Sequence, residues 1–246
     1  MRPDLLEAQA SVDWALSQLP DLSKRLDEWL KRGVTIEIKE LPSPADTNLI
    51  IAVENELLPL SFQAEVGAYI NSIRSSLDIL ASALVRRHNI PIPENRVGFP
   101  IMESKEKFDK AKDAQIFVQG LPALGQRLFN DLKPYQGGNE RLWTLHQLDI
   151  MRKHRRLLNA RLNPIHIWMT GSLAEGDFTP LGGEGSIQVN EETVLGMIRK
   201  GVPRPAIHTA FYVAIDEPGF AAKKPVTAAL AQMAQTASFV INFFDA

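Results

Sequence analysis

The sequence predicts an α+β fold, in which a helical core of long amphipathic helices packs with an antiparallel sheet. Three observations predict this class. Apolar residues recur at helical spacing over much of residues 60–160, apolar and polar residues alternate just after residue 33, and strand-like runs follow Pro164. We therefore expect a single domain over residues 1–246, whose sheet combines an early hairpin with later C-terminal strands.

The N-terminal region is predicted as a long helix followed by a hairpin. Leucines recur at helical spacing from Asp4 to Arg32, and Pro20 interrupts them, so two helices and one kinked helix are both compatible with the pattern. The runs "VTIEIKEL" and "TNLIIAVE" then predict two strands within about 34–55. An isolated hairpin is marginally stable in water, so we expect these strands to pair with later ones.

The helical core is predicted over about residues 60–160. Phe62 to His88 carries one apolar stripe at helical spacing, and short helices are expected at 103–113 and 121–132. A further helix is expected at about 139–160, with Asn139 as its N-cap. The stripe of the first helix consists of Val66, Ile70, Ile73, Leu77, Leu80 and Leu84.

The C-terminal third is predicted to be rich in strands over about 165–216 and to end in a helix at about 222–245. Three strand-like runs are "IHIWMTGSL", "GSIQVN" and "AIHTAFYVAIDE", and glycine-rich turns separate them. Between the second and third runs, "ETVLGMIRKG" is expected to form a short helix. These later strands are the expected partners of the early hairpin.

Composition narrows the classes of function. The chain contains no cysteine, which excludes a disulfide, a thiolate nucleophile and a cysteine-ligated metal. It has no His-Glu-x-x-His motif and no acidic triad, so we expect neither a metal nor a cofactor. No run approaches the roughly 20 apolar residues that span a bilayer, and the first residues do not resemble a signal peptide. We therefore expect a cytoplasmic protein without a membrane partner.

Two helical segments carry the candidate site. In "YINSIRSSLDIL", Asn71, Arg74 and Asp78 share one helical face beside the apolar stripe, and the last two are spaced to form an ion pair. In "LHQLDIMRKHRRLL", Asp149 and Lys153 are also spaced for an ion pair, and five consecutive basic or imidazole side chains end the segment. We expect the two helices to pack together and to form one polar cluster.

Three functions are compatible with this cluster. The first is non-catalytic binding of a small anion, such as phosphate, or of another small molecule. The proposed binding residues are Asn71, Arg74, Asp78, Asp149, Lys153 and His154. The second is a purely structural network, because cations near a helix C-terminus also favour the helix dipole and buried ion pairs are often architectural.

The third is a metal-independent ribonuclease, the one alternative that implies an RNA partner. Arg141 would hold a phosphate, and His146 or His154 would act as the general acid and base. Residues five apart on a helix point about 140° away from each other, so Arg141 and His146 would have to converge through long side chains or a dimer interface. The oligomeric state stays open, a homodimer included.

The two helical segments together resemble a widespread group of bacterial proteins without an assigned function. "IRSSLDILASAL" is similar to the Arg-Ser-Ala-Leu-Asp-His-Leu helix of that group, and "LHQLDIMRKHRRLL" to its Asp-Lys-His-Arg helix. A Phe-Pro-Ile step at Phe99 and the segment "LKPYQGG" lie between them, so the similarity spans about residues 60–160. Ile79 and Arg152 depart from the histidine and aspartate that the group often has there.

A second, weaker resemblance is to the HEPN superfamily of helical domains. Many of its members are dimeric ribonucleases with four to six residues between an arginine and a histidine, which Arg141 and His146 match. The predicted strands do not belong to a simple HEPN bundle. The resemblance implies the ribonuclease alternative and no other, since a shared fold does not establish an activity.

Overall fold

A computed structural model describes residues 1–170, 174–181, 187–189, 192–203 and 205–245. The chain forms two compact units. The helical unit comprises Met1–Asp21, Leu60–Asn159 and Ile215–Ala246, and the sheet unit comprises Leu22–Pro59 and Ala160–Ala214. Compactness does not show whether the units fold independently, so the single domain over residues 1–246 stays a prediction. The α+β class is confirmed.

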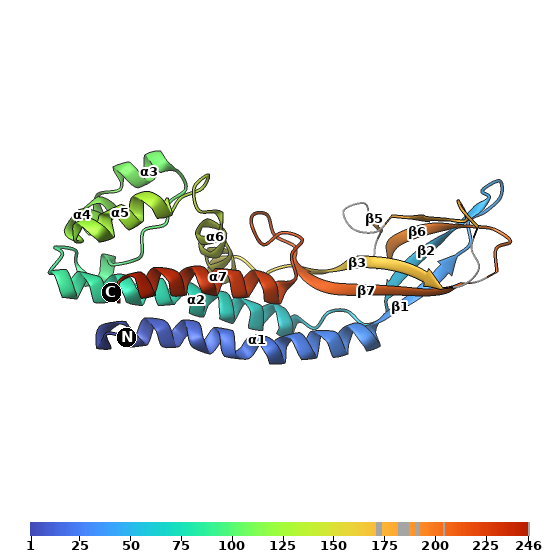
Figure 1. Ribbon diagram of the computed structural model, residues 1–246, viewed down its shortest axis with the longest axis horizontal. Helices are drawn as coiled ribbons and strands as arrows, with labels where there is room; N and C mark the ends of the chain where they lie inside the picture. Colours follow the sequence, from blue (N-terminus) through green and yellow to red (C-terminus); the bar gives the residue numbers. More distant parts are fainter. Residues whose placement is uncertain (171–173, 182–186, 190–191, 204, 246) are drawn as a thin grey trace. The chain divides into compact units, whose positions relative to one another are not determined.

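Three long helices run side by side in the helical unit (Figure 1). They are α1 (Leu6–Gly33), which follows the short η1 (Pro3–Leu5), α2 (Leu60–His88) and α7 (Val226–Phe243). The helix α1 continues through Pro20 without a break, and it enters the sheet unit at Leu22. One continuous helix therefore replaces the alternative of two helices.

The predicted apolar stripe of α2 forms the centre of the helical unit. Every member of the stripe is buried, with Ile70, Leu77, Leu80 and Leu84 fully so. Apolar faces of the neighbouring helices cover it, and burial of a large aliphatic side chain contributes about 1.5–3 kcal/mol. The buried residues contributed by η1, α1 and α7 include Leu5, Ala8, Val12, Leu230, Met233, Ala237 and Val240.

Shorter helices complete the helical unit. They are η2 (Glu94–Arg96), α3 (Lys105–Lys110), α4 (Lys112–Gly120), α5 (Ala123–Leu132) and α6 (Glu140–His154). The expected helix at 103–113 is thus divided between α3 and α4. Asn139 caps α6 as predicted, because its side chain accepts a hydrogen bond from the Leu142 amide. None of the helices in the described residues is both long and apolar enough to cross a membrane.

The helix α6 ends six residues earlier than the pattern predicts. Arg155 leaves the helical conformation, and Arg156 forms a bidentate pair with the buried carboxylate of Glu217, at 2.6 and 2.9 Å. The same carboxylate accepts the Asn159 amide at 2.8 Å. Glu217 lies far along the chain, so only the folded structure supplies the partner that ends the helix at His154.

The sheet unit contains a five-stranded antiparallel sheet in the order β1-β2-β6-β4, with β5 also paired to β6. Its strands are β1 (Val34–Lys39), β2 (Thr47–Glu54), β4 (Phe178–Pro180), β5 (Ile187–Val189) and β6 (Glu192–Arg199). The early hairpin therefore pairs with later strands, as predicted. The last turns of α1 add Leu22, Leu26 and Trp29 to the buried residues of this unit.

Two details of the sheet unit correct the prediction. The segment expected as a short helix is the central strand β6, where buried side chains follow one another without the alternation that identifies a strand from sequence. At Gly196 a Cβ atom would lie 2.6 Å from the Phe178 ring, so this strand tolerates no side chain there. Secondly, β3 (Ala160–Thr170) and β7 (Ala206–Ile215) form a separate two-stranded sheet. Parts of the predicted runs, at 171–173, 185–186 and 190, lie outside the described residues.

Candidate functional site

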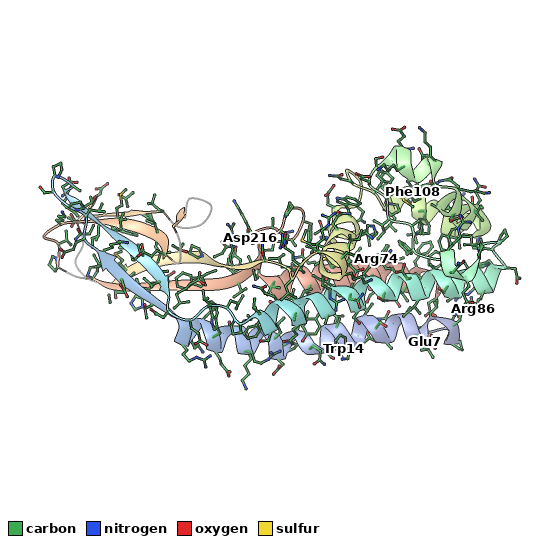
Figure 2. All side chains as sticks on the ribbon, turned by 180° about the vertical axis from the view of Figure 1, so that it is seen from behind. Glu7, Trp14, Arg74, Arg86, Phe108 and Asp216 are labelled. Carbon is green, nitrogen blue, oxygen red and sulfur yellow. The ribbon has the colours of Figure 1, made fainter. Side chains whose placement is uncertain are left out.

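The two helices that carry the sequence-predicted site are in contact. Asn71 on α2 donates to Asp149 on α6 at 3.1 Å, and Arg74 Nε donates to His146 Nδ1 at 3.4 Å. Figure 2 shows Arg74 where α2 passes α6. The predicted packing of these helices is therefore confirmed. We call the joined side chains the polar cluster, which consists of Asn71, Arg74, Asp78, His146, Asp149 and Lys153.

Arg74 is the centre of the polar cluster. Its side chain is almost fully buried, and it donates to Asp78 at 2.7 Å and to the Phe99 carbonyl at 3.1 Å. The same oxygen of Asp78 accepts the Phe99 amide at 2.8 Å. Arg74 and Asp78 together bind both backbone polar groups of Phe99, so they fix the loop after α2. A buried charge that is fully hydrogen-bonded in this way is a structural feature.

Asp149 holds the other half of the polar cluster. It is 4% exposed, and it accepts from Asn71 and from Lys153 Nζ, the latter at 2.7 Å. The side chain of Arg152 lies against α2 at Gly67. A Cβ atom at Gly67 would lie 2.8 Å from Arg152 Cγ. Gly67 therefore permits the close approach of α6 to α2.

His146 is held in its neutral form. Burial and the positive charge of Arg74 together lower its pKa to about 4, against the opposing effects of Asp78 and Asp149. The Arg74 guanidinium donates to Nδ1, which must therefore be unprotonated. A neutral imidazole that accepts this bond cannot also serve as a proton donor at Nδ1 near pH 7.

The structure does not bring the remaining predicted residues into the polar cluster. His154 is exposed and makes no hydrogen bond or ion pair with the described residues. Arg141 is exposed and contacts Phe220 rather than His146. The five consecutive basic or imidazole side chains therefore do not form one site. Lys153 pairs with Asp149, Arg156 pairs with Glu217, and the side chain of Arg152 lies against Gly67.

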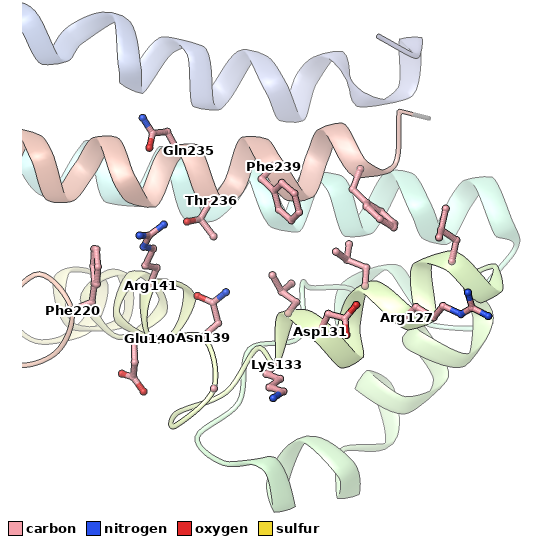
Figure 3. A pocket seen from close by; sticks show the side chains of 15 residues that line it. Arg127, Asp131, Lys133, Asn139, Glu140, Arg141, Phe220, Gln235, Thr236 and Phe239 are labelled. Carbon is pink, nitrogen blue, oxygen red and sulfur yellow. The ribbon is translucent and has the colours of Figure 1, made fainter.

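A cavity that the sequence did not predict lies between α5, the start of α6 and α7 (Figure 3). Its volume of about 860 Å³ falls within the roughly 300–1,000 Å³ of small-molecule sites. At one end are Arg141 and Phe220. Lys224 does not line the cavity, but its Nζ lies over the Phe220 ring. We call these three residues the cationic end. The apolar side chains in the rest of the lining form what we call the apolar groove, beside polar ones such as Arg127 and Asp131. The groove consists of Leu124, Leu128, Leu132, Phe239 and Phe243.

Two positive charges share the aromatic ring at the cationic end. The Arg141 guanidinium lies 5.3 Å from the Phe220 ring centroid, and Lys224 Nζ lies 3.1 Å from it. Among the described residues, neither cation has a hydrogen bond or an ion pair. Burial and the charge of Arg141 lower the pKa of Lys224. Arg141 also lies in the first turn of α6, where a cation opposes the helix dipole.

A tight loop places Phe220 against α6. Thr144 Oγ1 accepts the Phe220 amide at 2.9 Å. The preceding Gly219 has a positive φ of 104°, and a Cβ atom there would lie 2.7 Å from the same oxygen. Only glycine combines this backbone conformation with so close an approach. The local sequence "EPGF" signals a turn, but nothing in it identifies Thr144 as the partner.

The carboxylates that line the cavity do not neutralise the cationic end. Glu140 accepts a hydrogen bond from the Gly137 amide, and its side chain points away from α7 in Figure 3. Asp131 lies on α5, well apart from Phe220 in the same view. No group of three or more acidic or histidine side chains that could hold a metal ion occurs among the described residues.

No protein-family model, curated protein or solved structure matches this chain. The resemblances to the bacterial group and to the HEPN superfamily therefore stay predictions. The geometry gives the ribonuclease alternative no support, because Arg141 and His146 engage different partners on different elements.

Proposed function

We propose that the helical unit binds a small anionic ligand without transforming it, and that the cationic end holds the anion. One observation carries this proposal: Arg141 and Lys224 share the Phe220 ring, and neither has a carboxylate partner among the described residues. The positive charge of Arg141 disfavours the charged form of Lys224, and a bound anion would offset this repulsion. A guanidinium also matches carboxylate and phosphate through two parallel hydrogen bonds.

The proposal moves the expected binding site from the polar cluster to the cationic end. The cations of the polar cluster already have partners, since Arg74 pairs with Asp78 and Lys153 with Asp149. An anion there would have to displace an existing carboxylate. At the cationic end it would compete with water alone. The polar cluster instead holds α6 on α2, and α6 carries Arg141.

Binding rather than catalysis is supported by the groups that line the cavity. No histidine is among them in the described residues. General acid–base catalysis needs a group whose pKa lies near the working pH. The candidate histidines lie elsewhere, His146 in the polar cluster and His154 on the exposed end of α6.

Titration with inorganic phosphate, followed by amide chemical shifts or calorimetry, tests the proposal. We expect saturable binding that weakens about tenfold in Arg141→Gln, because loss of a charge-assisted hydrogen bond of about 1.5 kcal/mol corresponds to that factor. Arg127→Gln is the matched control, since Arg127 lines the cavity on α5 away from Phe220. Equal affinities for the two variants would contradict the proposal.

A further inference from the structure

We infer that the ligand is an amphiphile, with an anionic group at the cationic end and an apolar chain or ring system in the apolar groove. This inference rests on the proposed function and adds the chemical class of the ligand. It follows from the continuity of the cavity, which runs from Arg141 and Phe220 to the apolar side chains of Leu124, Leu128, Leu132, Phe239 and Phe243, with polar side chains such as Arg127, Asp131 and Gln235 also in its lining.

The apolar groove is formed by two helices. Leu124 and Leu128 lie one turn apart on α5, and Phe239 and Phe243 lie one turn apart on α7. This spacing places each pair on one helical face. In Figure 3, Phe239 extends from α7 towards α5, and Arg141 extends from α6 towards α7. A ligand held by Arg141 can therefore extend along α7 over Phe239.

Side chains of the apolar groove expose apolar surface that a bound ligand would remove from water. Leu124 is 58% exposed and Phe239 is 59% exposed. Apolar area removed from water contributes roughly 25 cal/mol per Å², so covering these two side chains favours an apolar occupant. Large apolar side chains grouped on a surface typically mark a binding site.

The helix α5, which carries one side of the groove, packs closely against the residue that follows α7. At Gly125 a Cβ atom would lie 3.0 Å from the Phe244 ring and 3.1 Å from Leu121 Cβ. Gly125 and Phe244 are both buried. This packing holds α5 beside the end of α7.

Charge and shape favour a small molecule over a second copy of the chain. Two copies that met at this site through a twofold axis would oppose one concave surface to another and bring like charges together. A volume of about 860 Å³ suits a compact organic anion. The cationic end and the apolar groove complement the two ends of an amphiphile.

A series of carboxylates of increasing chain length tests the inference on the full chain: acetate, butanoate, hexanoate and octanoate. We expect affinity to rise up to about fourfold for each methylene that enters the groove, as burial of a methylene predicts. Phe239→Ser should flatten this increase. Leu57→Ser is the matched control, because Leu57 is also a large exposed apolar residue but lies in the sheet unit.

The outcomes separate this inference from the proposed function. Equal affinities for acetate and octanoate, together with Arg141-dependent phosphate binding, would overturn the amphiphile and leave the proposed function standing. Chain-length dependence that is unchanged in Arg141→Gln would instead overturn the anionic anchor. A concentration-dependent dimer in sedimentation that Phe239→Ser dissociates would overturn the inference by showing that a second copy covers the groove.

Discussion

Two regions that share α6 differ in how their charges are satisfied. In the polar cluster, Arg74 and Asp149 are buried, and each has at least two hydrogen-bond partners. At the cationic end, Arg141 and Lys224 both form cation–π contacts with the Phe220 ring, and neither pairs with a carboxylate among the described residues. A network in which every buried polar group has a hydrogen-bond partner is typical of a structural role. Positive charge without a carboxylate partner beside a cavity is typical of a binding site.

The comparison shows that charge density in the sequence is a poor guide to the site. The stretch from Arg152 to Arg156 contains the densest positive charge of the chain, yet the fold uses Lys153 and Arg156 in ion pairs. Arg141 and Lys224 lie far apart in the sequence, and both contact one phenylalanine ring. Four measurements test whether the polar cluster is structural and the cationic end is not.

Removal of the arginine in the polar cluster should have the largest effect. Arg74→Ala removes three hydrogen bonds of a buried guanidinium, to Asp78, to the Phe99 carbonyl and to His146. We expect the free energy of unfolding to fall by about 3 kcal/mol, the upper end for hydrogen bonds to a charged group. Urea denaturation measures it. Arg127→Ala, on an exposed position of α5, should stay within about 0.5 kcal/mol. A loss below about 1 kcal/mol for Arg74→Ala would mean that water replaces the arginine.

Asp149→Ala should have the next largest effect, because its carboxylate binds both Asn71 and Lys153 from a buried position. We expect a loss of about 2–3 kcal/mol, the upper range for hydrogen bonds to a charged group. Lys153→Ala tests the partner, whose side chain is 37% exposed, and should cost under about 1 kcal/mol. Similar losses in both variants would show that the ion pair, rather than the buried carboxylate, matters.

The neutral state of His146 should make stability depend on pH. Its pKa is about 4 in the folded chain, against an ordinary value of 6.5 for histidine, so the unfolded chain binds more protons between these values. Stability is therefore full above about pH 6.5 and falls as the pH drops towards 4. We expect a loss of about 2 kcal/mol between pH 7.5 and 5 that His146→Gln lacks. Parallel pH profiles in urea melts would contradict a buried neutral histidine.

The smallest changes are expected where the charges lack partners. His154→Ala and Arg141→Gln should each alter the free energy of unfolding by less than about 0.5 kcal/mol, as exposed substitutions do. Arg141→Gln should even be slightly stabilising, since it removes a cation from the first turn of α6. A clear destabilisation by Arg141→Gln in a thermal melt would make Arg141 part of the structure rather than of a binding site.

Much of the helical unit was predictable because its signals are local. The stripe from Val66 to Leu84 repeats at the helical period, and Asn139 is a typical N-cap. The i, i+4 pairs of Arg74 with Asp78 and of Asp149 with Lys153 follow from helix geometry. The contact between their helices was predictable from the apolar stripes beside them.

The failures have a different origin. The segment from Glu192 to Arg199 was predicted as a helix. It forms a strand because it pairs with β2 on one side and with β4 and β5 on the other. The end of α6 depends on Glu217, about 60 residues further along the chain. Neither the strands that pair with β6 nor Glu217 can be identified from the residues next to these segments. A hydrogen bond between segments far apart in the sequence produces no periodic pattern of residues.

By itself, the sequence determined the α+β class, the long helices, the early hairpin and the residues of the polar cluster, because periodicity, capping and side-chain spacing act over one or two turns. Only the tertiary structure decided which charges are satisfied. It closed the polar cluster around Arg74, and it folded a loop at Gly219 so that Phe220 meets Arg141. Burial and electrostatic pairing depend on distances between remote segments, and the path of the whole chain sets those distances.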